Sequence, residues 1–255
     1  MSKQKEQSKE QKQTKEEYKK DYKSPSGVPA QQTPQMPELP PEVKERLDKI
    51  KAKLDKFKKL IVEKFDKYIM GICLLPPPQE KPGMDAEELK KLKDEKDKVH
   101  ILVLIDDTEP TKMSKQELRD KLFAIIEKEA KEADQNFLPQ TLLLTELWQN
   151  CYDGKSELLQ LIAMSAQVYD TGMVSAIRIA EIHKTMVLKK FEKYIVAYVL
   201  AGSLVQGKAT KESDIDVCIV VDDTDVKKMK RVELKDKLRA IIIGMGIEAG
   251  EMTGI

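Results

Sequence analysis

Two aspartates, Asp214 and Asp216, are spaced so that a strand would direct both carboxylates to one face. They follow a Gly202-Ser203 pair after a ten-residue polar loop, Leu204–Ser213. Two carboxylates held close together repel each other unless a cation lies between them, and such oxygen ligands suit Mg²⁺. Gly202 lacks a Cβ, so the backbone can approach a phosphate closely. The pattern predicts metal-assisted chemistry on a phosphate.

Each part of this pattern is weak by itself, because a Gly-Ser pair is usually a turn and an Asp-x-Asp is most often a solvated strand end. The combination is more specific, since a buried strand normally excludes two charges on one face unless a ligand pairs with them. Lys208 and Lys211 are the nearest cations for a phosphate. Gly207 is expected to shape the loop, and Ser213 is expected to cap or orient Asp214.

The segment Tyr198–Asp225 resembles the polymerase-β-like nucleotidyltransferase superfamily, whose signature is a Gly-Ser or Gly-Gly turn followed, after a loop, by Asp-x-Asp in an apolar strand. The resemblance implies a Mg²⁺-dependent enzyme that transfers a nucleoside monophosphate from an NTP to an acceptor hydroxyl. Asp214 and Asp216 would be its catalytic metal ligands. Gly202 and Ser203 would bind the triphosphate, with Ser203 at the β- or γ-phosphate.

The acceptor is left open, because the family's acceptors include nucleic-acid ends, small molecules and protein hydroxyls, and the fold does not select among them. A second hypothesis is a non-catalytic nucleotide-binding or scaffold protein. Enzymes of this superfamily usually carry a third carboxylate on a later strand. The sequence counterpart of that strand in the first half, Thr141–Leu144, contains no acid, and Glu248 and Glu251 are the only acids near the end of the chain.

The elements that position the aspartates occur twice. Val99–Ile126 aligns without gaps with Ile215–Ile242, with 13 of the 28 positions identical. Upstream, Lys64–Leu75 matches Lys190–Ala201. We interpret the two segments as a tandem duplication, because chance similarity between charged helices would not repeat a whole order of elements.

The first copy has lost the residues of the predicted site. Lys98 and His100 stand where the second copy has the two aspartates, and Pro76-Pro77 replaces the Gly-Ser pair. The first copy is therefore expected to be inactive, with His100 a strand-edge core residue. Both copies keep an Asp-Asp-Thr segment, which predicts a structural role in capping the helix that follows it. His183 is expected to be structural as well.

Each copy predicts a helix, a short apolar strand, a loop, a buried strand and an amphipathic helix. The expected strands are Ile69–Leu75, Val99–Ile105, Ile195–Ala201 and Ile215–Val221, with another at Thr141–Leu144. Helices are expected over residues 41–68 and 157–168, and from about Val174. The order predicts an α/β (α+β) fold of two tandem nucleotidyltransferase-like lobes, each a small mixed sheet with flanking helices.

We expect three segments along the chain. Residues 1–42 are rich in Lys, Gln and Pro and have almost nothing to bury, which predicts a disordered tail. Residues 43–188 form the degenerate lobe with its N-terminal helix, and residues 189–255 form the motif lobe. The motif lobe is expected to be incomplete at its C-terminus, and the degenerate lobe is expected to act as its partner in an intramolecular pseudo-dimer.

Composition excludes some classes of partner. The formal net charge of +1 gives no overall field for nucleic acid, although the Lys-rich tail leaves a contact with RNA or DNA open. No apolar run approaches the roughly 20 residues of a membrane span. The three cysteines are widely spaced and form no metal-ligand pattern. Together with the lack of a secretory signal, this predicts reduced thiols in a cytoplasmic protein.

Overall fold

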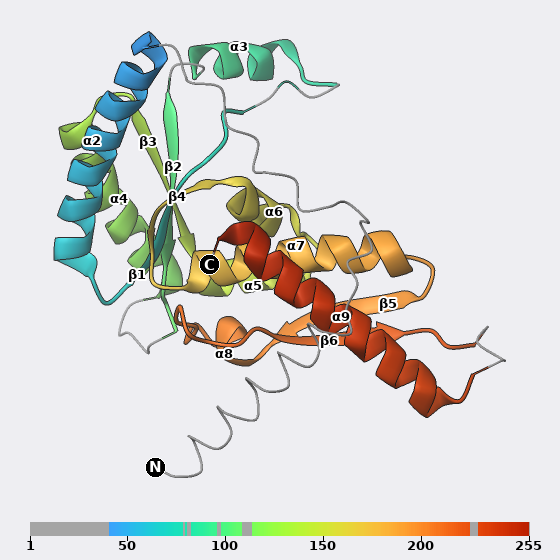
Figure 1. Cartoon of the computed structure of the whole chain (residues 1–255). Helices are drawn as coiled ribbons and strands as arrows, with labels where there is room; N and C mark the ends of the chain where they lie inside the picture. Colours follow the sequence, from blue (N-terminus) through green and yellow to red (C-terminus); the bar gives the residue numbers. More distant parts are fainter. Residues whose placement is uncertain are drawn as a thin grey trace. The chain divides into compact units, whose positions relative to one another are not determined.

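The computed structural model describes residues 41–78, 80, 83–95, 98–108, 114–224 and 229–254 (Figure 1). The predicted disordered tail lies outside the described residues as far as residue 40. The chain divides into two compact units. Among the described residues, the larger unit comprises 41–181 and 200–218, and the smaller unit comprises 182–199, 219–224 and 229–254.

The described chain forms a mixed α/β fold with two sheets. Its strands are β1 (Ile69–Leu74), β2 (Val99–Ile105), β3 (Phe137–Leu143), β4 (Ala166–Asp170), β5 (Ile195–Ala201) and β6 (Asp216–Val221). Its helices are α2 (Pro41–Phe65), α3 (Ala86–Asp94), α4 (Lys115–Ala133), α5 (Leu144–Tyr152), α6 (Glu157–Met164), α7 (Met173–Phe191), α8 (Gly202–Val205) and α9 (Arg231–Thr253).

The four-stranded sheet of the larger unit has the order β3-β2-β1-β4. Strand β1 is antiparallel to β2 and β4, and β2 is parallel to β3, so the sheet is mixed as the sequence predicts. The register pairs Val103 with Thr141 and Gly71 with Asp170. Strand β2 is central and is buried from His100 to Ile105, which explains the apolar run Ile101–Ile105.

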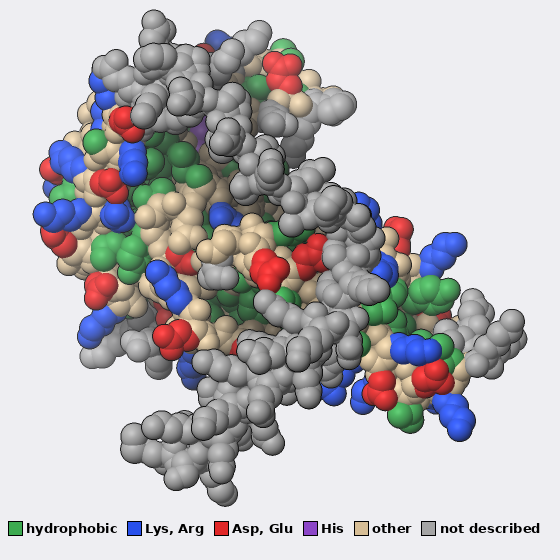
Figure 2. Space-filling model, viewed as in Figure 1, with side chains coloured by type: hydrophobic (Ala, Val, Ile, Leu, Met, Phe, Trp, Pro, Cys, Tyr) green, Lys and Arg blue, Asp and Glu red, His purple; other side chains and the backbone are tan. Residues whose placement is uncertain are grey.

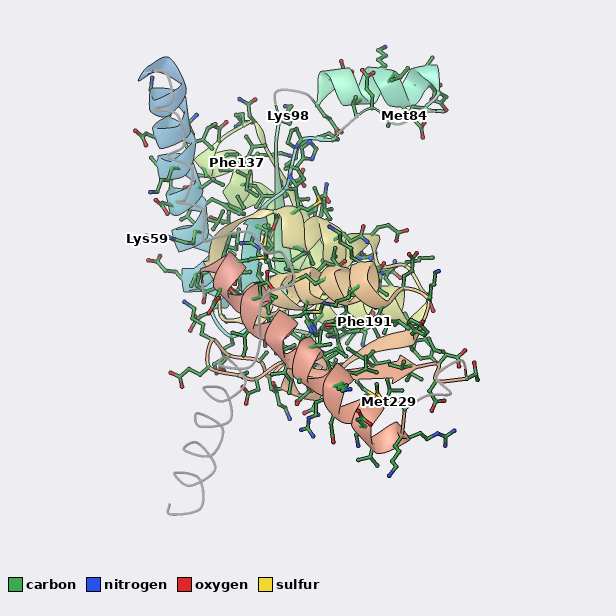
Figure 3. The ribbon with its side chains drawn as sticks, turned by 45° about the vertical axis from the view of Figure 1, so that its right-hand side comes forward. Lys59, Met84, Lys98, Phe137, Phe191 and Met229 are labelled. Atoms are coloured by element: carbon green, nitrogen blue, oxygen red, sulfur yellow. The ribbon has the colours of Figure 1, made fainter. Side chains whose placement is uncertain are left out.

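Alternate side chains of the sheet enter two separate cores. On one face, Ile101 and Val103 of β2 pack with Phe57 and Ile61 of α2 and with residues of α4. Phe57 also meets Phe137 of β3 edge to face, with ring centroids 6.1 Å apart. Phe137 is labelled in Figure 3. On the other face, sheet residues pack with α5, α6 and the first half of α7. The sheet is therefore covered by helices on both faces.

The smaller unit is held together around His183 of α7. Its Nδ1 lies 2.8 Å from the hydroxyl of Tyr198 on β5, and its Nε2 lies 3.0 Å from the carbonyl oxygen of Ile242 on α9. Because a carbonyl oxygen only accepts, Nε2 carries the proton and Nδ1 accepts from Tyr198. These two bonds link three elements, which agrees with the structural role predicted for His183.

Several predicted boundaries agree closely with the structure. Strands β2 and β5 have the predicted bounds, and α2 and α7 end at Phe65 and Phe191, the phenylalanines that precede the Lys-Tyr-Ile motif. The predicted helix over residues 157–168 is wrong at its end, because α6 stops at Met164 and residues 166–170 form β4. The sequence also did not predict α3 or α8. The second sheet contains β5 and β6 and is a two-stranded antiparallel sheet rather than a mixed one.

Charges of both signs are interspersed over the surface of α2. Figure 2 shows no field of a single sign on this face, and ion pairs such as Lys58–Asp55 lie along the helix. This arrangement agrees with a solvated helix face rather than a basic nucleic-acid surface. None of the helices in the described residues is long and apolar enough to span a membrane. Cys73 is buried, Cys151 is half-buried and Cys218 is exposed.

Candidate active site

The carboxylate of Asp216 lies directly against Gly202. Gly202 follows the last residue of β5, and Asp216 is the first residue of β6, so the antiparallel strands bring them together. A Cβ built on Gly202 would stand 2.9 Å from Cγ of Asp216 and still nearer to its Oδ2. Gly202 also has a φ of 72°, a conformation that L side chains rarely adopt. Both features require a glycine at this position.

The two aspartates of the motif are both exposed to solvent. Asp216 begins β6, whereas Asp214 precedes the strand, so the strand is one residue shorter than the sequence predicts. Ile215, the residue between the two aspartates, packs against the core of the larger unit. An exposed pair beside a glycine can accept a divalent cation and the phosphate oxygens that accompany it.

The Gly202-Ser203 pair opens a short helical turn instead of a simple turn. The N–H groups of Gln206 and Lys208 donate to the carbonyls of Gly202 and Ser203 at 3.3 and 2.9 Å. Ser203 is half-buried in this turn, α8. The chain therefore leaves β5 through a compact, hydrogen-bonded segment that fixes the backbone of both residues.

The loop after α8 is anchored in the core of the larger unit. Leu204 and Ala209 are buried in the same core as Leu144 of α5. Gly207 has a φ of 73°, and a Cβ there would stand 2.7 Å from Cδ2 of Leu144 and 3.3 Å from the methyl group of Thr108. The prediction that Gly207 shapes the loop agrees with this close contact.

The polar residues of the loop separate into two groups. Lys208 and Lys211 are exposed on the loop, and their role at the phosphate stays a prediction. Ser213 is bonded to Thr210, three residues earlier in the chain. Its Oγ accepts from the N–H of Thr210 at 2.9 Å, and its own N–H donates to the Thr210 carbonyl at 3.0 Å. Ser213 therefore closes the turn that precedes Asp214.

The candidate metal ligands of the site are the carboxylates of Asp214 and Asp216. Within the described ranges, no group of three or more His, Cys, Asp or Glu side chains is close enough to hold a metal ion. Asp214 and Asp216 alone fit a divalent cation that keeps several waters and substrate oxygens in its shell, as Mg²⁺ does. Because Gly202 has no side chain, the Asp216 carboxylate can lie against the Gly202 backbone. A phosphate can approach the backbone at the same place.

The residues that align with the Gly-Ser pair and the two aspartates lie at or beside the end of β1 and the start of β2. The N–H of Leu75 donates to the carbonyl of His100 at 2.9 Å, so the end of β1 lies beside the start of β2. His100 is buried, and its Nε2 lies 3.8 Å from a carboxylate oxygen of Glu95. It is a core residue as predicted, although it lies on the central strand β2 rather than at the edge of the sheet.

The prediction that the Asp-Asp-Thr segment caps the following helix is wrong. Helix α4 is capped by Ser114, and α9 has no side-chain cap at Lys230. Asp106 instead accepts from the N–H of Thr108 at 2.9 Å, within its own turn. Asp107 accepts from the N–H of Thr145 at 3.0 Å, so it caps α5, a helix that starts 37 residues further along the chain.

One residue that contacts the site was not identified from the sequence. Gly172, in the turn between β4 and α7, has a φ of 127°, and a Cβ there would stand 2.5 Å from the backbone nitrogen of Lys211. The signal was the Asp-Thr-Gly sequence at residues 170–172, which marks a turn but gives no indication of the loop that lies against it.

Comparison with protein families gives one finding. Residues 181–243 match the family model described as the nucleotidyltransferase domain. The match includes β5, α8, the loop, β6 and the first half of α9, and therefore Gly202, Asp214 and Asp216. Neither the comparison with curated proteins nor that with solved structures finds a match.

Proposed function

We propose that this chain, which carries a polymerase-β-like nucleotidyltransferase domain at residues 181–243, transfers a nucleoside monophosphate from an NTP to an acceptor hydroxyl. The observation that carries the proposal is the contact between Gly202 and the carboxylate of Asp216. It joins the two halves of the motif, the phosphate-binding turn and the paired acids, in one place. Neither half alone would distinguish a nucleotide site from an ordinary turn or strand end.

The reaction requires few protein groups. The acceptor hydroxyl oxygen forms a bond to the α-phosphorus, the bond from that phosphorus to the bridging oxygen of the β-phosphate breaks, and pyrophosphate leaves with both bonding electrons. The hydroxyl proton passes to solvent or to a base. Transfers of this kind depend mainly on positioning and on neutralising charge.

In this proposal, Asp214 and Asp216 hold Mg²⁺, which would lower the pKa of the acceptor hydroxyl and neutralise charge on the triphosphate. Gly202 lets the triphosphate approach the backbone, and Ser203 donates a hydrogen bond to the β- or γ-phosphate. Lys208 and Lys211, both exposed on the loop, attract the remaining phosphate charge. The acceptor, whether a nucleic-acid end, a small molecule or a protein hydroxyl, is not selected by these residues.

Calorimetric titration with Mg·ATP and Mg·GTP tests the site. We expect wild-type protein to bind at least one of them, and the double variant Asp214→Ala, Asp216→Ala to lose this binding. The control is Asp222→Asn, at the other end of β6, which keeps the oxygen that accepts from the N–H of Thr224 at 2.9 Å. Equal binding by wild type and the double variant would sink the proposed site.

Catalysis needs a separate measurement, the release of pyrophosphate or the transfer of labelled NMP to a panel of acceptors. Turnover by wild type that is absent in the double variant supports the enzyme. Nucleotide binding without turnover favours the second candidate, a non-catalytic nucleotide-binding or scaffold protein. The observation behind this alternative is that Asp214 and Asp216 have no third metal-ligating side chain grouped with them in the described residues.

We also propose that the chain contains a tandem duplication, and matched hydrogen bonds support it. The N–H of Asp106 donates to the carbonyl of Tyr68 at 2.7 Å, and the N–H of Asp222 donates to that of Tyr194 at 2.8 Å. These four residues correspond in the sequence alignment. The bond within the turn is repeated too, since the Thr224 N–H donates to Asp222 as that of Thr108 does to Asp106.

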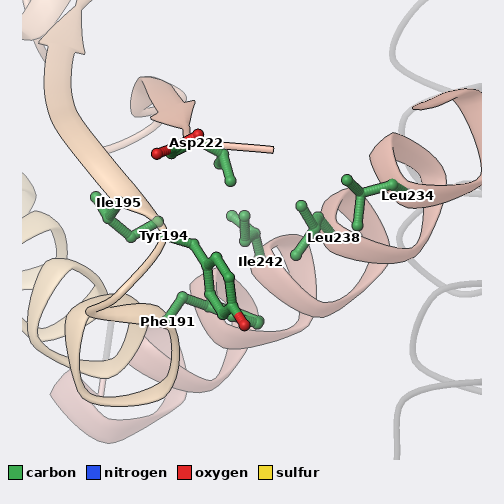
Figure 4. A pocket seen from close by; sticks show the side chains of 8 residues that line it. Phe191, Tyr194, Ile195, Asp222, Leu234, Leu238 and Ile242 are labelled. Carbon is green, nitrogen blue, oxygen red and sulfur yellow. The ribbon is translucent and has the colours of Figure 1, made fainter. Parts of the chain in front are cut away.

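A pocket in the smaller unit gives independent support for the duplication (Figure 4). Its lining residues all have counterparts in the aligned first copy. They are Phe191, Tyr194, Ile195, Val221, Asp222, Leu234, Leu238 and Ile242. Five of the counterparts are buried in the core between the sheet, α2 and α4, namely Ile69, Ile105, Leu118, Leu122 and Ile126. The same positions therefore face inward in both copies.

The remaining proposals concern assembly and location. We propose that the first copy substitutes for the second subunit of a dimer, so light scattering should give the mass of a monomer. A homodimer joined through the motif lobes would contradict this. We propose a cytoplasmic location, because the three cysteines are widely spaced in the sequence and form no metal-ligand pattern, and cell fractionation tests it.

A further inference from the structure

The turn between β4 and α7 is held rigidly by Asp170. This buried carboxylate accepts hydrogen bonds from the N–H groups of Gly172 and Val174, each at 2.9 Å, and from that of Ser175 at 3.0 Å. It also accepts from the hydroxyl of Ser175 at 2.5 Å. These bonds cap the start of α7 and leave the backbone of the turn little freedom.

The other side of the turn is fixed to the sheet. Thr171 donates its N–H and its hydroxyl to the carbonyl of Met70 on β1, both at 3.0 Å. Asp170 itself pairs with Gly71 in the register of β4 and β1. Gly172 is therefore held between a central part of the sheet and the first turn of a helix, in a position that cannot shift without disturbing both.

The backbone of the loop that precedes Asp214 lies against Gly172. A Cβ on Gly172 would stand 2.5 Å from the nitrogen of Lys211 and 2.9 Å from Cα of Thr210. These are backbone atoms, so a side chain could not be accommodated by a simple rotation. With a φ of 127°, Gly172 also adopts a conformation that other residues avoid.

The loop residues that contact Gly172 belong to the turn that immediately precedes Asp214. Thr210 and Ser213 are joined by reciprocal bonds, from Thr210 N–H to Ser213 Oγ at 2.9 Å and from Ser213 N–H to Thr210 oxygen at 3.0 Å. Asp214 is the next residue after this turn. The position of the turn on Gly172 therefore determines where the chain enters the Asp214-x-Asp216 segment.

We propose that Gly172 is a positioning residue for the metal-binding pair Asp214 and Asp216, acting through the Thr210–Ser213 turn. The inference rests on the proposed function, because it assigns the pair to a metal. It also gives a function to the degenerate lobe at residues 43–188. That lobe has lost the catalytic residues, but its turn at residues 170–172 contacts the loop that precedes Asp214.

The test compares Gly172→Ala with Gly154→Ala. Gly154 has a φ of 78° and no described atom within 4 Å of a built Cβ, so its variant also places a side chain on a positive-φ backbone, but without the contact. Two quantities are measured at a temperature well below the thermal unfolding midpoint of each variant. The first is the rate of tryptic cleavage after Lys208 and Lys211, followed by mass spectrometry. The second is the affinity for Mn²⁺, a paramagnetic substitute for Mg²⁺.

For Gly172→Ala we expect cleavage at these two lysines to be about tenfold faster and Mn²⁺ binding to be about tenfold weaker than in Gly154→Ala, since exposure of a loop raises its cleavage and a misplaced ligand loses affinity. If nucleotidyl transfer is detected, kcat should fall on the order of 100-fold with a smaller change in the KM for NTP. Equal cleavage and equal Mn²⁺ affinity in the two variants would overturn the proposal.

A second variant keeps the test decisive if Gly172→Ala does not fold. Ser213→Ala removes the acceptor of the Thr210 N–H and loosens the same turn from the other side, so it should change both quantities in the same direction by a smaller factor. Faster cleavage with unchanged Mn²⁺ affinity would contradict the positioning of the acids. If wild type itself binds no Mn²⁺, the proposed function fails, whereas the cleavage rates still decide whether Gly172 holds the loop.

Discussion

The side chain of Asp216 occupies the space that a Cβ would take on Gly202. Its Cγ lies 2.9 Å and its Cβ 3.1 Å from that position. The glycine and the acid are 14 residues apart in the chain, at the facing ends of two antiparallel strands. The loop between them can vary in its surface residues, but the two ends must stay in register for the carboxylate to reach the backbone of the turn.

A methyl group at Gly202 is expected to disable the site while leaving the fold intact. In Gly202→Ala, the Asp216 carboxylate must rotate away, and the backbone must hold a φ of 72° with a side chain present. We expect kcat for NMP transfer to fall by about 100-fold. Gly83→Ala is the matched control, because Gly83 has a φ of 94° and no described atom within 4 Å of a Cβ. Similar losses in both variants would contradict the prediction.

The two exposed lysines are expected to act on nucleotide affinity more than on the chemical step. The double variant Lys208→Gln, Lys211→Gln should raise the KM for NTP by about fivefold per lysine, since exposed charges contribute weakly. The effect should shrink as salt is added, because salt screens exposed charges. Lys155→Gln, an exposed lysine outside the loop, is the control. A fall in kcat at unchanged KM would assign the lysines a different role.

Local sequence patterns correctly predicted those strands whose own residues form an apolar run. The β-branched run of β2 and the apolar run of β5 mark buried or half-buried strands, and both have the bounds that the sequence predicts. The Gly-Ser and Asp-x-Asp residues could be assigned to one site because a strand and a turn were enough to bring them together. The aligned segment in the first half of the chain has Pro76-Pro77, Lys98 and His100 at these positions, which the proposed duplication would explain as a loss of the site.

Contacts between distant residues were not predictable in the same way. Strand β4 reads Ala-Gln-Val-Tyr-Asp, which has no clear period, and pairing with β1, almost 100 residues earlier, makes it a strand. Asp107 caps α5 rather than the next helix because β2 and β3 are parallel neighbours with Ile105 opposite Leu143, so the residues that follow the two strands meet. No local pattern indicates this pairing. Gly172 was visible only as a turn residue, since the loop that lies on it is some 40 residues away.

The hydrogen bonds by which Asp107 caps α5 should contribute measurably to the free energy of unfolding. Asp107 is buried and accepts from both the N–H and the hydroxyl of Thr145, so Asp107→Ala should lower the free energy of unfolding by about 1–2 kcal/mol. The acid at the aligned sequence position, Asp223, forms an ion pair with the highly exposed Arg231. Asp223→Ala should therefore cost less than about 0.5 kcal/mol. Urea denaturation of both variants tests the difference, and equal losses would contradict the assigned cap.

The buried His183 should make stability depend on pH. Burial lowers the pKa of its imidazole below the ordinary value of 6.5, while the bond to the carbonyl of Ile242 opposes this in part. The unfolded chain therefore binds a proton at a pH where the folded chain does not. Stability is fully present above about pH 6.5 and is lost as the pH falls from there through the folded pKa.

The matched variant is His183→Gln, whose amide can donate to the carbonyl of Ile242 and accept from Tyr198 without titrating. We expect the free energy of unfolding of wild type to decrease between pH 7.5 and pH 5.5, and that of the variant to decrease less over the same interval, as measured by urea denaturation in steps of about half a pH unit. An equal slope in both proteins would mean that the stability of the smaller unit does not depend on a neutral His183.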